Sequence, residues 1–430
     1  MTTEIAVMNR TGIALAADSA VTISSVAGVS IRNNANKLFS LSKYHPVGVM
    51  IYGNAVFTEI PWEVIIKSYR QSLGDKEFKS VNEYSSHFFK YLNSYGIPDD
   101  NQISYVNSIA RTITNGIKTH VDAQVKEKFQ NSNAVTNKEI KDIFTDYLTK
   151  LLENINNQKI DVYYTKSRLT TIGKKYQKII TSSINSDLMQ FKPTKGHREA
   201  ILNVIIRAAA KGIAGNLSGI VIAGYGANDI YPVCCNYGVL GFLEGKTIKH
   251  DNNVSVITCR NNSEILSFAQ SDDIKAFIEG IAPKPDNFLK KTFEEALVNQ
   301  LPTLLQDELS KELKITNDKI KSKIHTIAKD SCSGIFNGMF SEFKRYKEQT
   351  CVNPVLRAIG AMEKTELAVI AETLVNLVSF RKQVTMDMET VGGPIDVAII
   401  TKGDGFIWAK RKHYFKPELN HHFFNNYYRR

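Results

Sequence analysis

The sequence has no long apolar run, and this absence excludes several classes of protein. A membrane-spanning helix needs about 18 consecutive apolar residues. The best stretch here, 367–378, is interrupted by Glu372 and has helical spacing. A secretory signal is not expected either, because Glu4 and Arg10 break the first apolar run and 13–17 is too short. We therefore expect a cytoplasmic protein with no membrane association.

Cysteine and phosphate-binding motifs are also lacking. There are five cysteines and no C-x-x-C pair, so we expect neither a zinc site nor a disulfide framework, and we expect buried or inert thiols. The pair His421-His422 has no further ligands nearby in the sequence, and two histidines rarely make a metal site. Gly224-x-Gly226 lacks the third glycine of a dinucleotide loop and is interpreted as a turn. No cofactor is predicted.

Length and charge are less decisive. The 430 residues allow two or three domains, or one large domain with insertions, and the apolar content is ordinary for a globular chain. The net charge is 54 − 43 = +11, which can indicate a nucleic-acid partner. However, the lysines are scattered among acidic residues along helical segments, and no RNA-binding signature or arginine-rich run is present. We do not expect nucleic acid to be the main partner.

The chain is divided into blocks of strands and blocks of helices. Strand texture covers 1–57 and returns at 215–285, and a final helix with a strand pair covers 360–410. Helical texture fills 58–211 and 287–346, with Pro302 expected to break or kink the second block, and an aromatic, basic tail follows at 411–430. The clearest helix is 137–156, whose apolar residues form one stripe. Such blocks predict an α+β protein with antiparallel sheets layered with helices.

The individual strands are predicted from alternation and turn residues. They are 3–8, 13–17, 21–31, 38–41, 47–52, 219–223, 230–236, 240–243, 247–249, 254–258, 395–401 and 406–410. Further helices are predicted at 198–214 and 365–382.

The candidate chemistry lies at the first residues. Met1 stands before the small residue Thr2, so we expect the initiator Met to be trimmed. A free Thr2 carries a hydroxyl nucleophile beside an α-amine, whose ordinary pKa near 7.7–8.0 leaves an appreciable neutral fraction at pH 7. That amine can take the hydroxyl proton directly or through one water.

Two charged residues downstream strengthen this hypothesis. Asp18 ends the second strand of the first hairpin, and Lys37 opens a later strand. Each is costly to bury alone, and as a pair they satisfy one another. A positive Lys37 near the Thr2 hydroxyl would favour its deprotonated form. Gly53 closes a strand, where its N–H can face a developing oxyanion.

These motifs resemble the opening of proteasome β-type subunits and of the bacterial proteasome-like peptidase HslV. The residues concerned are Thr2-Thr3, 12–19 (GIALAADS), Lys37-Leu38-Phe39 and 50–53 (MIYG). Near the other end, 392–401 (GGPIDVAIIT) and 403–405 (GDG) resemble the last core strand pair of those subunits.

The resemblance implies an N-terminal-nucleophile hydrolase with a four-layer αββα sandwich, carrying two large helical insertions at 58–211 and 287–346. It implies peptide-bond hydrolysis, with Thr2 as nucleophile and its amine as base. The residues implied in the site are Asp18 and Lys37 as supporting pair, Gly53 as oxyanion donor, and Ala20, Ala35 and Ile51 near the substrate side chain. Because the last three are small or apolar, we expect cleavage after apolar residues.

The chain departs from the family pattern around the nucleophile's amine. The family's Asp aligns with Met388, between Asp387 and Glu389, and one companion Ser aligns with Val391. The other Ser falls near Gln270 or Ser271. Asp387, Glu389 or Ser271 are the candidates to replace them.

Three functions are therefore compatible with the sequence. The first is a threonine peptidase acting on peptides or unfolded protein, as a homo-oligomer that could be a ring fed by an ATPase unfoldase. The second is an inactive scaffold or gating subunit, which the missing Ser and Asp favour. The third is an amidase acting on small amides.

Overall fold

The computed structural model describes residues 3–25, 28–132, 134–385, 392–413, 415–422 and 425. The chain divides into two compact units. The first comprises Met1–Ala35, Ile257–Thr401 and Ile407–Arg430, and the second comprises Asn36–Val256 and Lys402–Phe406. Both combine an antiparallel sheet with helices, so the α+β class predicted from the sequence is confirmed.

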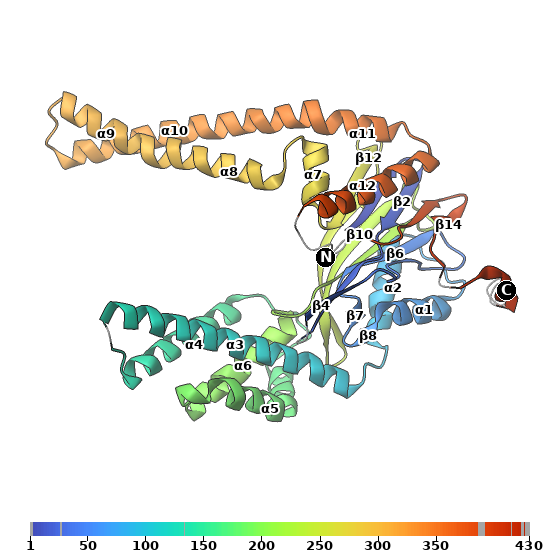
Figure 1. Cartoon of the computed structure of the whole chain (residues 1–430), viewed down its shortest axis with the longest axis horizontal. Coiled ribbons are helices and arrows are strands. Elements are labelled where there is room, and N and C mark those ends of the chain that lie inside the picture. Colours follow the sequence, from blue (N-terminus) through green and yellow to red (C-terminus); the bar gives the residue numbers. More distant parts are fainter. Residues whose placement is uncertain are drawn as a thin grey trace. The chain divides into compact units, whose positions relative to one another are not determined.

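The first unit is built on a five-stranded sheet in the order β12-β1-β2-β13-β14. Its strands are β1 (Thr3–Asn9), β2 (Gly12–Ala17), β12 (Ser263–Ala269), β13 (Asp396–Thr401) and β14 (Gly405–Lys410). The helices α7 (Asp272–Glu279), α11 (Asn353–Gly360) and α12 (Lys364–Val384) accompany it. In Figure 1, α12 lies along this sheet.

Alternation along the strands decides what α12 covers. Ile5 and Val7 of β1 pack with Leu374 and Val378 of α12 in one hydrophobic cluster. The alternate residues of these strands, such as Ala6, are also apolar. The sheet of this unit therefore has two apolar faces, of which its own helices cover one.

A long helical arm also belongs to the first unit. It begins with α8 (Pro283–Glu294), continues through a π-helical stretch (Glu295–Gln300) into α9 (Leu301–Glu312), and returns as α10 (Asp318–Lys347). A second π-helical stretch, Glu348–Val352, leads into α11. Pro302, expected to break or kink the helix, lies at the start of α9 just after the π-helical stretch. A proline there lacks the N–H that a regular helix would use, which fits the irregular backbone before it.

The second unit contains the other five-stranded sheet, in the order β11-β10-β9-β6-β5. Its strands are β5 (Leu38–Ser40), β6 (Val47–Gly53), β9 (Ser218–Gly224), β10 (Val233–Leu243) and β11 (Lys246–Val256). The helices α1 (Trp62–Leu73) and α2 (Val81–Asn93) pack on one face through buried aromatic and aliphatic side chains such as Trp62, Tyr69 and Phe88.

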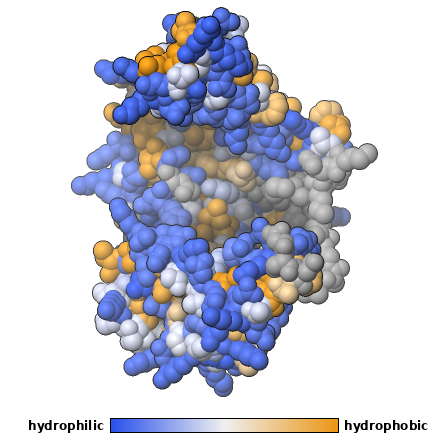
Figure 2. Space-filling model, turned by 90° about the vertical axis from the view of Figure 1, so that its left-hand side faces the viewer, coloured by the Kyte–Doolittle hydropathy of each residue, from blue (hydrophilic) through white to orange (hydrophobic). Residues whose placement is uncertain are grey.

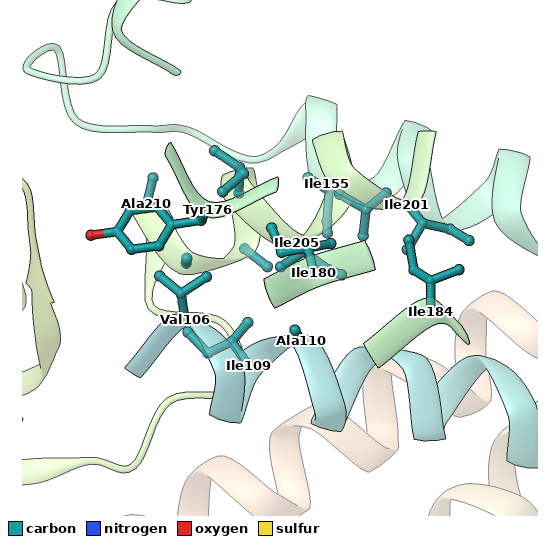
Figure 3. Packing of buried hydrophobic residues seen from close by; sticks show 14 of the residues in the cluster. Val106, Ile109, Ala110, Ile155, Tyr176, Ile180, Ile184, Ile201, Ile205 and Ala210 are labelled. Carbon is teal, nitrogen blue, oxygen red and sulfur yellow. The ribbon is translucent and has the colours of Figure 1, made fainter. Parts of the chain in front are cut away.

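A four-helix bundle fills the rest of the second unit. Its helices are α3 (Asp99–Ser132), α4 (Asn137–Asn157), α5 (Lys166–Leu188) and α6 (Lys195–Lys211). Figure 3 shows Val106, Ile109, Tyr176, Ile180 and Ile205 meeting in its interior. In the stretch 58–211, predicted as a helical insertion, the first two helices pack on one face of the sheet through their apolar stripes. The later four pack mainly on one another, together with Leu243 and Ile248 of the sheet.

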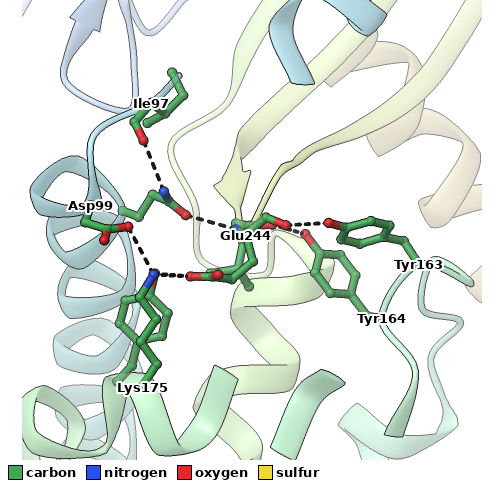
Figure 4. Close-up of polar contacts among 9 residues, drawn as sticks. Ile97, Asp99, Tyr163, Tyr164, Lys175 and Glu244 are labelled. Carbon is green, nitrogen blue, oxygen red and sulfur yellow. Dashed lines mark hydrogen bonds and ion pairs between the residues drawn. The ribbon is translucent and has the colours of Figure 1, made fainter. Parts of the chain in front are cut away.

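Glu244 joins this bundle to the sheet. It lies in the turn between β10 and β11, and its backbone N–H donates to Gln102 (2.9 Å). Its carboxylate accepts from Lys175 (2.6 Å) and from the Tyr176 hydroxyl (2.8 Å). Lys175 also contacts Asp99 (3.0 Å), and the hydroxyls of Tyr163 and Tyr164 donate to the carbonyls of Glu244 and Leu243 (Figure 4). The turn is thus fixed by helices α3 and α5 at once.

The remaining elements are short. They are β3 (Val21–Ser25), β4 (Gly28–Arg32), β7 (Val56–Phe57), β8 (Ile60–Pro61) and the 3-10 turns Met189–Phe191 and Pro417–Leu419. Among the described residues, no helix is long and apolar enough to cross a membrane.

We predict that Gly219→Ala destabilises the second unit. Tyr52 of β6 pairs with Gly219 of β9, and a Cβ at Gly219 would lie 1.9 Å from the Tyr52 ring. The ring cannot move away without disturbing its hydroxyl, which donates to Asn236 (3.0 Å). Overpacking of this kind costs about 1–3 kcal/mol. Denaturant unfolding measures it.

Gly334→Ala is the matched control. Gly334 lies inside α10 with nothing within 4 Å of a Cβ, so the same substitution should stabilise that helix by about 0.5–1 kcal/mol. Equal effects of the two substitutions would contradict the expected role of the Tyr52 ring.

Candidate functional site

Asp18 is a buried side chain that several backbone groups hold in place. It follows β2 directly and is 1% exposed. One carboxylate oxygen accepts the Thr3 N–H (3.1 Å), and the other accepts the N–H groups of Ala20 (3.3 Å) and Gly392 (3.1 Å). Its own N–H donates to the Thr3 carbonyl (3.3 Å). A buried carboxylate with three N–H donors is held rigidly, because bonds to a charged acceptor are strong.

The Thr3 contact places Asp18 beside the start of β1. The Thr3 nitrogen is bonded to the carbonyl carbon of Thr2, so Asp18 binds the peptide group that follows the predicted nucleophile. Thr2 itself lies outside the described residues, as do Asp387, Met388, Glu389 and Val391.

The loop after Asp18 is attached to the segment that precedes β13. The Ser19 N–H donates to the Gly392 carbonyl (3.2 Å), and the Ser19 hydroxyl donates to the Pro394 carbonyl. Gly393 has φ +77°, and a Cβ there would lie 2.9 Å from the Asn33 carbonyl oxygen, so glycine is required. The two ends of the sequence that carry the family-like motifs therefore meet at Asp18.

Two predicted substrate-contacting residues lie around the same loop. Ala20 is fully buried and donates its N–H to Asp18. Ala35 donates its N–H to the Ser19 carbonyl (3.1 Å). The first unit thus brings together Asp18, Ala20, Ala35 and the start of β1.

Lys37, Ile51 and Gly53 come together in the second unit. Lys37 is 3% exposed and immediately precedes β5, and its carbonyl accepts the Ile51 N–H (2.8 Å). Ile51 is 4% exposed and belongs to the cluster that α1 and α2 cover. Gly53 ends β6 two residues later, with an exposed backbone position.

Gly53 is also a position that only glycine fits. Its φ is +77°, and a Cβ there would lie 2.5 Å from the Leu217 carbonyl oxygen. The next residue, Asn54, donates its N–H to that same carbonyl (3.0 Å), which fixes the end of the strand. The site residues therefore form two groups, Asp18 with Ala20 and Ala35 in one unit and Lys37 with Ile51 and Gly53 in the other.

The sequence reasoning missed strand β12. Its last residue, Ala269, pairs with Thr3 and has φ +62°, which is uncommon for a residue other than glycine. The chain then passes through Gln270 to Ser271, which precedes α7 and makes no capping hydrogen bond with its side chain. Ser271 is thus two residues beyond the partner of Thr3. Strained backbone of this kind is frequent at functional sites.

The Thr3 hydroxyl is a further residue that sequence reasoning did not single out. Thr3 is fully buried, and its Oγ1 has no hydrogen-bond partner in the described part of the chain. A buried, unpaired hydroxyl costs about 1–3 kcal/mol. We therefore predict that Thr3→Val raises the melting temperature, because valine has the same shape without the unpaired group. A loss of stability in a thermal melt would instead mean that the hydroxyl has a partner in the folded protein.

The two adjacent cysteines have the character of inert, buried thiols. Cys234 and Cys235 are buried, and burial raises the pKa of the Cys235 thiol to about 11. The Cys235 thiol also donates to Asn82 (3.1 Å). Among the described residues, no group of three or more His, Cys, Asp or Glu is placed to hold a metal ion.

Comparison with known proteins adds little. No protein-family profile and no curated protein matches the chain. Among solved structures, an Anbu (Gly-1) mutant from Hyphomicrobium sp. strain MC1 is similar over 99% of this chain and 92% of its own, at 8% identity and a TM-score of 0.27. Anbu (ancestral beta-subunit) from Yersinia bercovieri is similar over 99% and 94%, at 8% identity and a TM-score of 0.25. Similarity at this level assigns neither a family nor an activity.

Proposed function

We propose that the chain is a proteasome-like threonine peptidase, in which Thr2 hydrolyses peptide bonds once Met1 has been removed. The observation that carries the proposal is the contact between the Asp18 carboxylate and the Thr3 N–H. The buried carboxylate fixes the position of the peptide group that follows Thr2. An N-terminal nucleophile needs such a fixed orientation to attack a substrate carbonyl.

We further propose that the two sheets stack face to face in a four-layer αββα sandwich. Each sheet is covered on one face by helices of its own unit, α12 in the first and α1 with α2 in the second. On the opposite faces, the alternate residues are apolar as well, for example Leu15 of β2 and Val221 of β9. A sheet with two apolar faces needs a layer on both, and in this proposal each sheet provides the layer that the second face of the other one needs.

In this proposal each site residue has one role. The Thr2 hydroxyl oxygen attacks the substrate carbonyl carbon, and its proton passes to the Thr2 amine directly or through a water. Lys37 stabilises the developing negative charge at that oxygen, and Asp18 orients both the nucleophile and Lys37. The Gly53 N–H donates to the oxyanion. Collapse expels the substrate amine with the proton, and water then hydrolyses the ester on Thr2.

The amine needs a hydrogen-bonding neighbour, and we assign that role to Ser271. Ser271 lies two residues after Ala269, and the pairing of Ala269 with Thr3 brings this segment alongside the start of β1. The proposed substrates are peptides or unfolded proteins in the cytoplasm. The proposed working form is a homo-oligomer, to which an ATPase unfoldase delivers substrate.

The test combines intact mass with covalent labelling. Purified protein should lack Met1 and should gain one equivalent of an N-terminal-threonine-directed epoxyketone or boronate. Retained Met1, or labelling that does not depend on Thr2, would contradict the proposal.

An inactive scaffold is the second candidate, and it is favoured by Met388 and Val391 at the positions where active relatives carry Asp and Ser. It predicts a correctly trimmed protein that takes up no label and cleaves no peptide. The labelling experiment therefore separates the two functions.

A further inference from the structure

The helical arm, defined as 283–347, buries few of its apolar side chains between its own helices. Of the residues in α8, α9, α10 and the π-helical stretch between them, only four are buried. They are Pro302, Ser310, Cys332 and Phe336. By contrast, nearly half of all exposed large hydrophobic side chains in the described chain lie in this arm. Figure 2, which looks onto the end of the arm, shows hydrophobic groups at its surface among hydrophilic ones. Such a concentration marks an interaction surface.

Five of these side chains form a single stripe, which we call the arm stripe. It consists of Leu305, Leu309, Ile327, Ile335 and Met339, each between 38% and 64% exposed. Each residue stands immediately before one that is less exposed. Ser310 and Phe336 are buried, and Gln306, Ala328 and Phe340 are partly buried, as expected for residues directed toward the other helix of the arm. The stripe is therefore rotated by about 100° from the contact between the helices, in the same sense on both.

The antiparallel course of the helices puts the stripe on one face. On each helix, the stripe residue precedes the inward-facing residue by one position, so it is turned by the same angle about the helix axis. Because the two helices run in opposite directions, these equal turns bring both sets of stripe residues to the same side of the pair. The arm is thus a two-helix hairpin with one wide apolar face. Two such hairpins complete a four-helix bundle when their faces meet.

Charged residues at the edges of this face favour one orientation of the arm of a second copy relative to the first. Glu308 and Glu312 flank the stripe on α9, and Lys319 and Lys323 flank it on α10, all of them exposed. Glu312 and both lysines make no ion pair within the described chain, and Glu308 pairs only with Lys311 of its own helix. A two-fold axis along the arm sets α9 of one copy against α10 of the other, with both tips together. Acidic edges then face basic edges.

We propose that the helical arm is a dimerisation element, in which the arm stripes of two copies of this chain pack into a four-helix bundle about a two-fold axis along the arm. This goes beyond the proposed hydrolase and does not depend on Thr2.

The test is the mass of the full chain in solution. Sedimentation over a wide range of concentration should give a dimer or an even-numbered assembly. The double substitution Leu309→Lys with Ile335→Lys should halve the mass, with the far-ultraviolet circular dichroism unchanged. The control Phe129→Lys changes an exposed phenylalanine of α3 (54% exposed) and should leave the mass unaltered.

A charge exchange tests the orientation without touching the stripe. Glu308→Lys with Glu312→Lys should raise the dimer dissociation constant at least about tenfold, and adding Lys319→Glu with Lys323→Glu should restore it. A monomeric wild type, or an assembly that keeps its mass in the double-lysine variant, would overturn the proposal. Failure of rescue would overturn the tip-to-tip orientation. Peptidase labelling of the same samples is independent, so a failure of the arm and a failure of the hydrolase remain distinguishable.

Discussion

Thr2→Ala should remove all peptide hydrolysis, by a factor of about 10⁴ or more, and all covalent labelling by the epoxyketone. The substitution deletes the hydroxyl that forms the ester, and no step of the proposed reaction can proceed without it. Stability should change little, because Ala and Thr leave the Asp18 contact with the Thr3 N–H intact. Fluorogenic peptide hydrolysis and intact mass after labelling measure the two effects.

The matched control for Thr2 is its neighbour. Thr3→Ala changes the same residue type one position later, where the hydroxyl is buried without a partner in the described chain. It should keep labelling at Thr2. A pH profile adds a second check, since the free amine must be neutral to act as a base, and labelling should therefore decline as the pH falls below about 8, the ordinary pKa of an α-amine. A wild type that neither cleaves peptide nor takes up label would leave the scaffold as the function of the chain, whereas equal, measurable activity in wild type and Thr2→Ala would exclude Thr2 as the nucleophile.

Asp18→Asn should lower both stability and the rate of labelling. One Asp18 oxygen accepts the Thr3 N–H and the other accepts those of Ala20 and Gly392. An asparagine in either orientation turns an N–H donor toward another N–H donor, so at least one buried donor loses its acceptor. Because hydrogen bonds to charged groups contribute about 1.5–3 kcal/mol each, we expect a loss of about 3 kcal/mol in the free energy of unfolding.

Asp146→Asn is the control for this charge removal. Asp146 is exposed on α4 and, among the described residues, its one ion pair is with Lys150 one turn away (2.7 Å), so its loss should cost no more than about 0.5 kcal/mol. Urea unfolding gives the stabilities, and the labelling rate at saturating reagent gives the effect on the nucleophile. An Asp18→Asn protein that labels at the wild-type rate would show that the carboxylate anchors the fold and does not orient Thr2.

Several elements were predictable because their signal is local. The helix predicted at 137–156 is observed at Asn137–Asn157, and its start carries a capping box between Thr136 and Glu139. The first hairpin is equally local, since apolar strands flank a turn whose Thr11 N–H donates to the Asn9 side chain (2.8 Å). Spacing and turn residues suffice for such elements.

Other elements were misjudged because pairing outweighs local preference. The sequence of β12, SEILSFA, mixes polar and apolar residues on both faces, and it becomes a strand through its pairing with β1. In the same way, 247–249 and 254–258 were predicted as separate strands and are joined in β11, whose polar centre, with Asp251 and Asn253, is held by pairing with β10. β10 was likewise predicted as two strands, 230–236 and 240–243, because Gly238 and Gly241 interrupt its pattern.

The sequence by itself predicted the residue types of the candidate site, because a hydroxyl beside an amine after removal of Met1, an acid at one strand end and a glycine at another are features of residue type and spacing. It could not determine which distant backbone groups meet the acid. Gly392 donates to Asp18 across 374 positions, and only the pairing of β2 with β13 brings them together. The arm stripe is likewise visible only once the course of α9 and α10 is known. The stripe is one face because the two helices lie antiparallel, and neither helix sequence alone shows that arrangement.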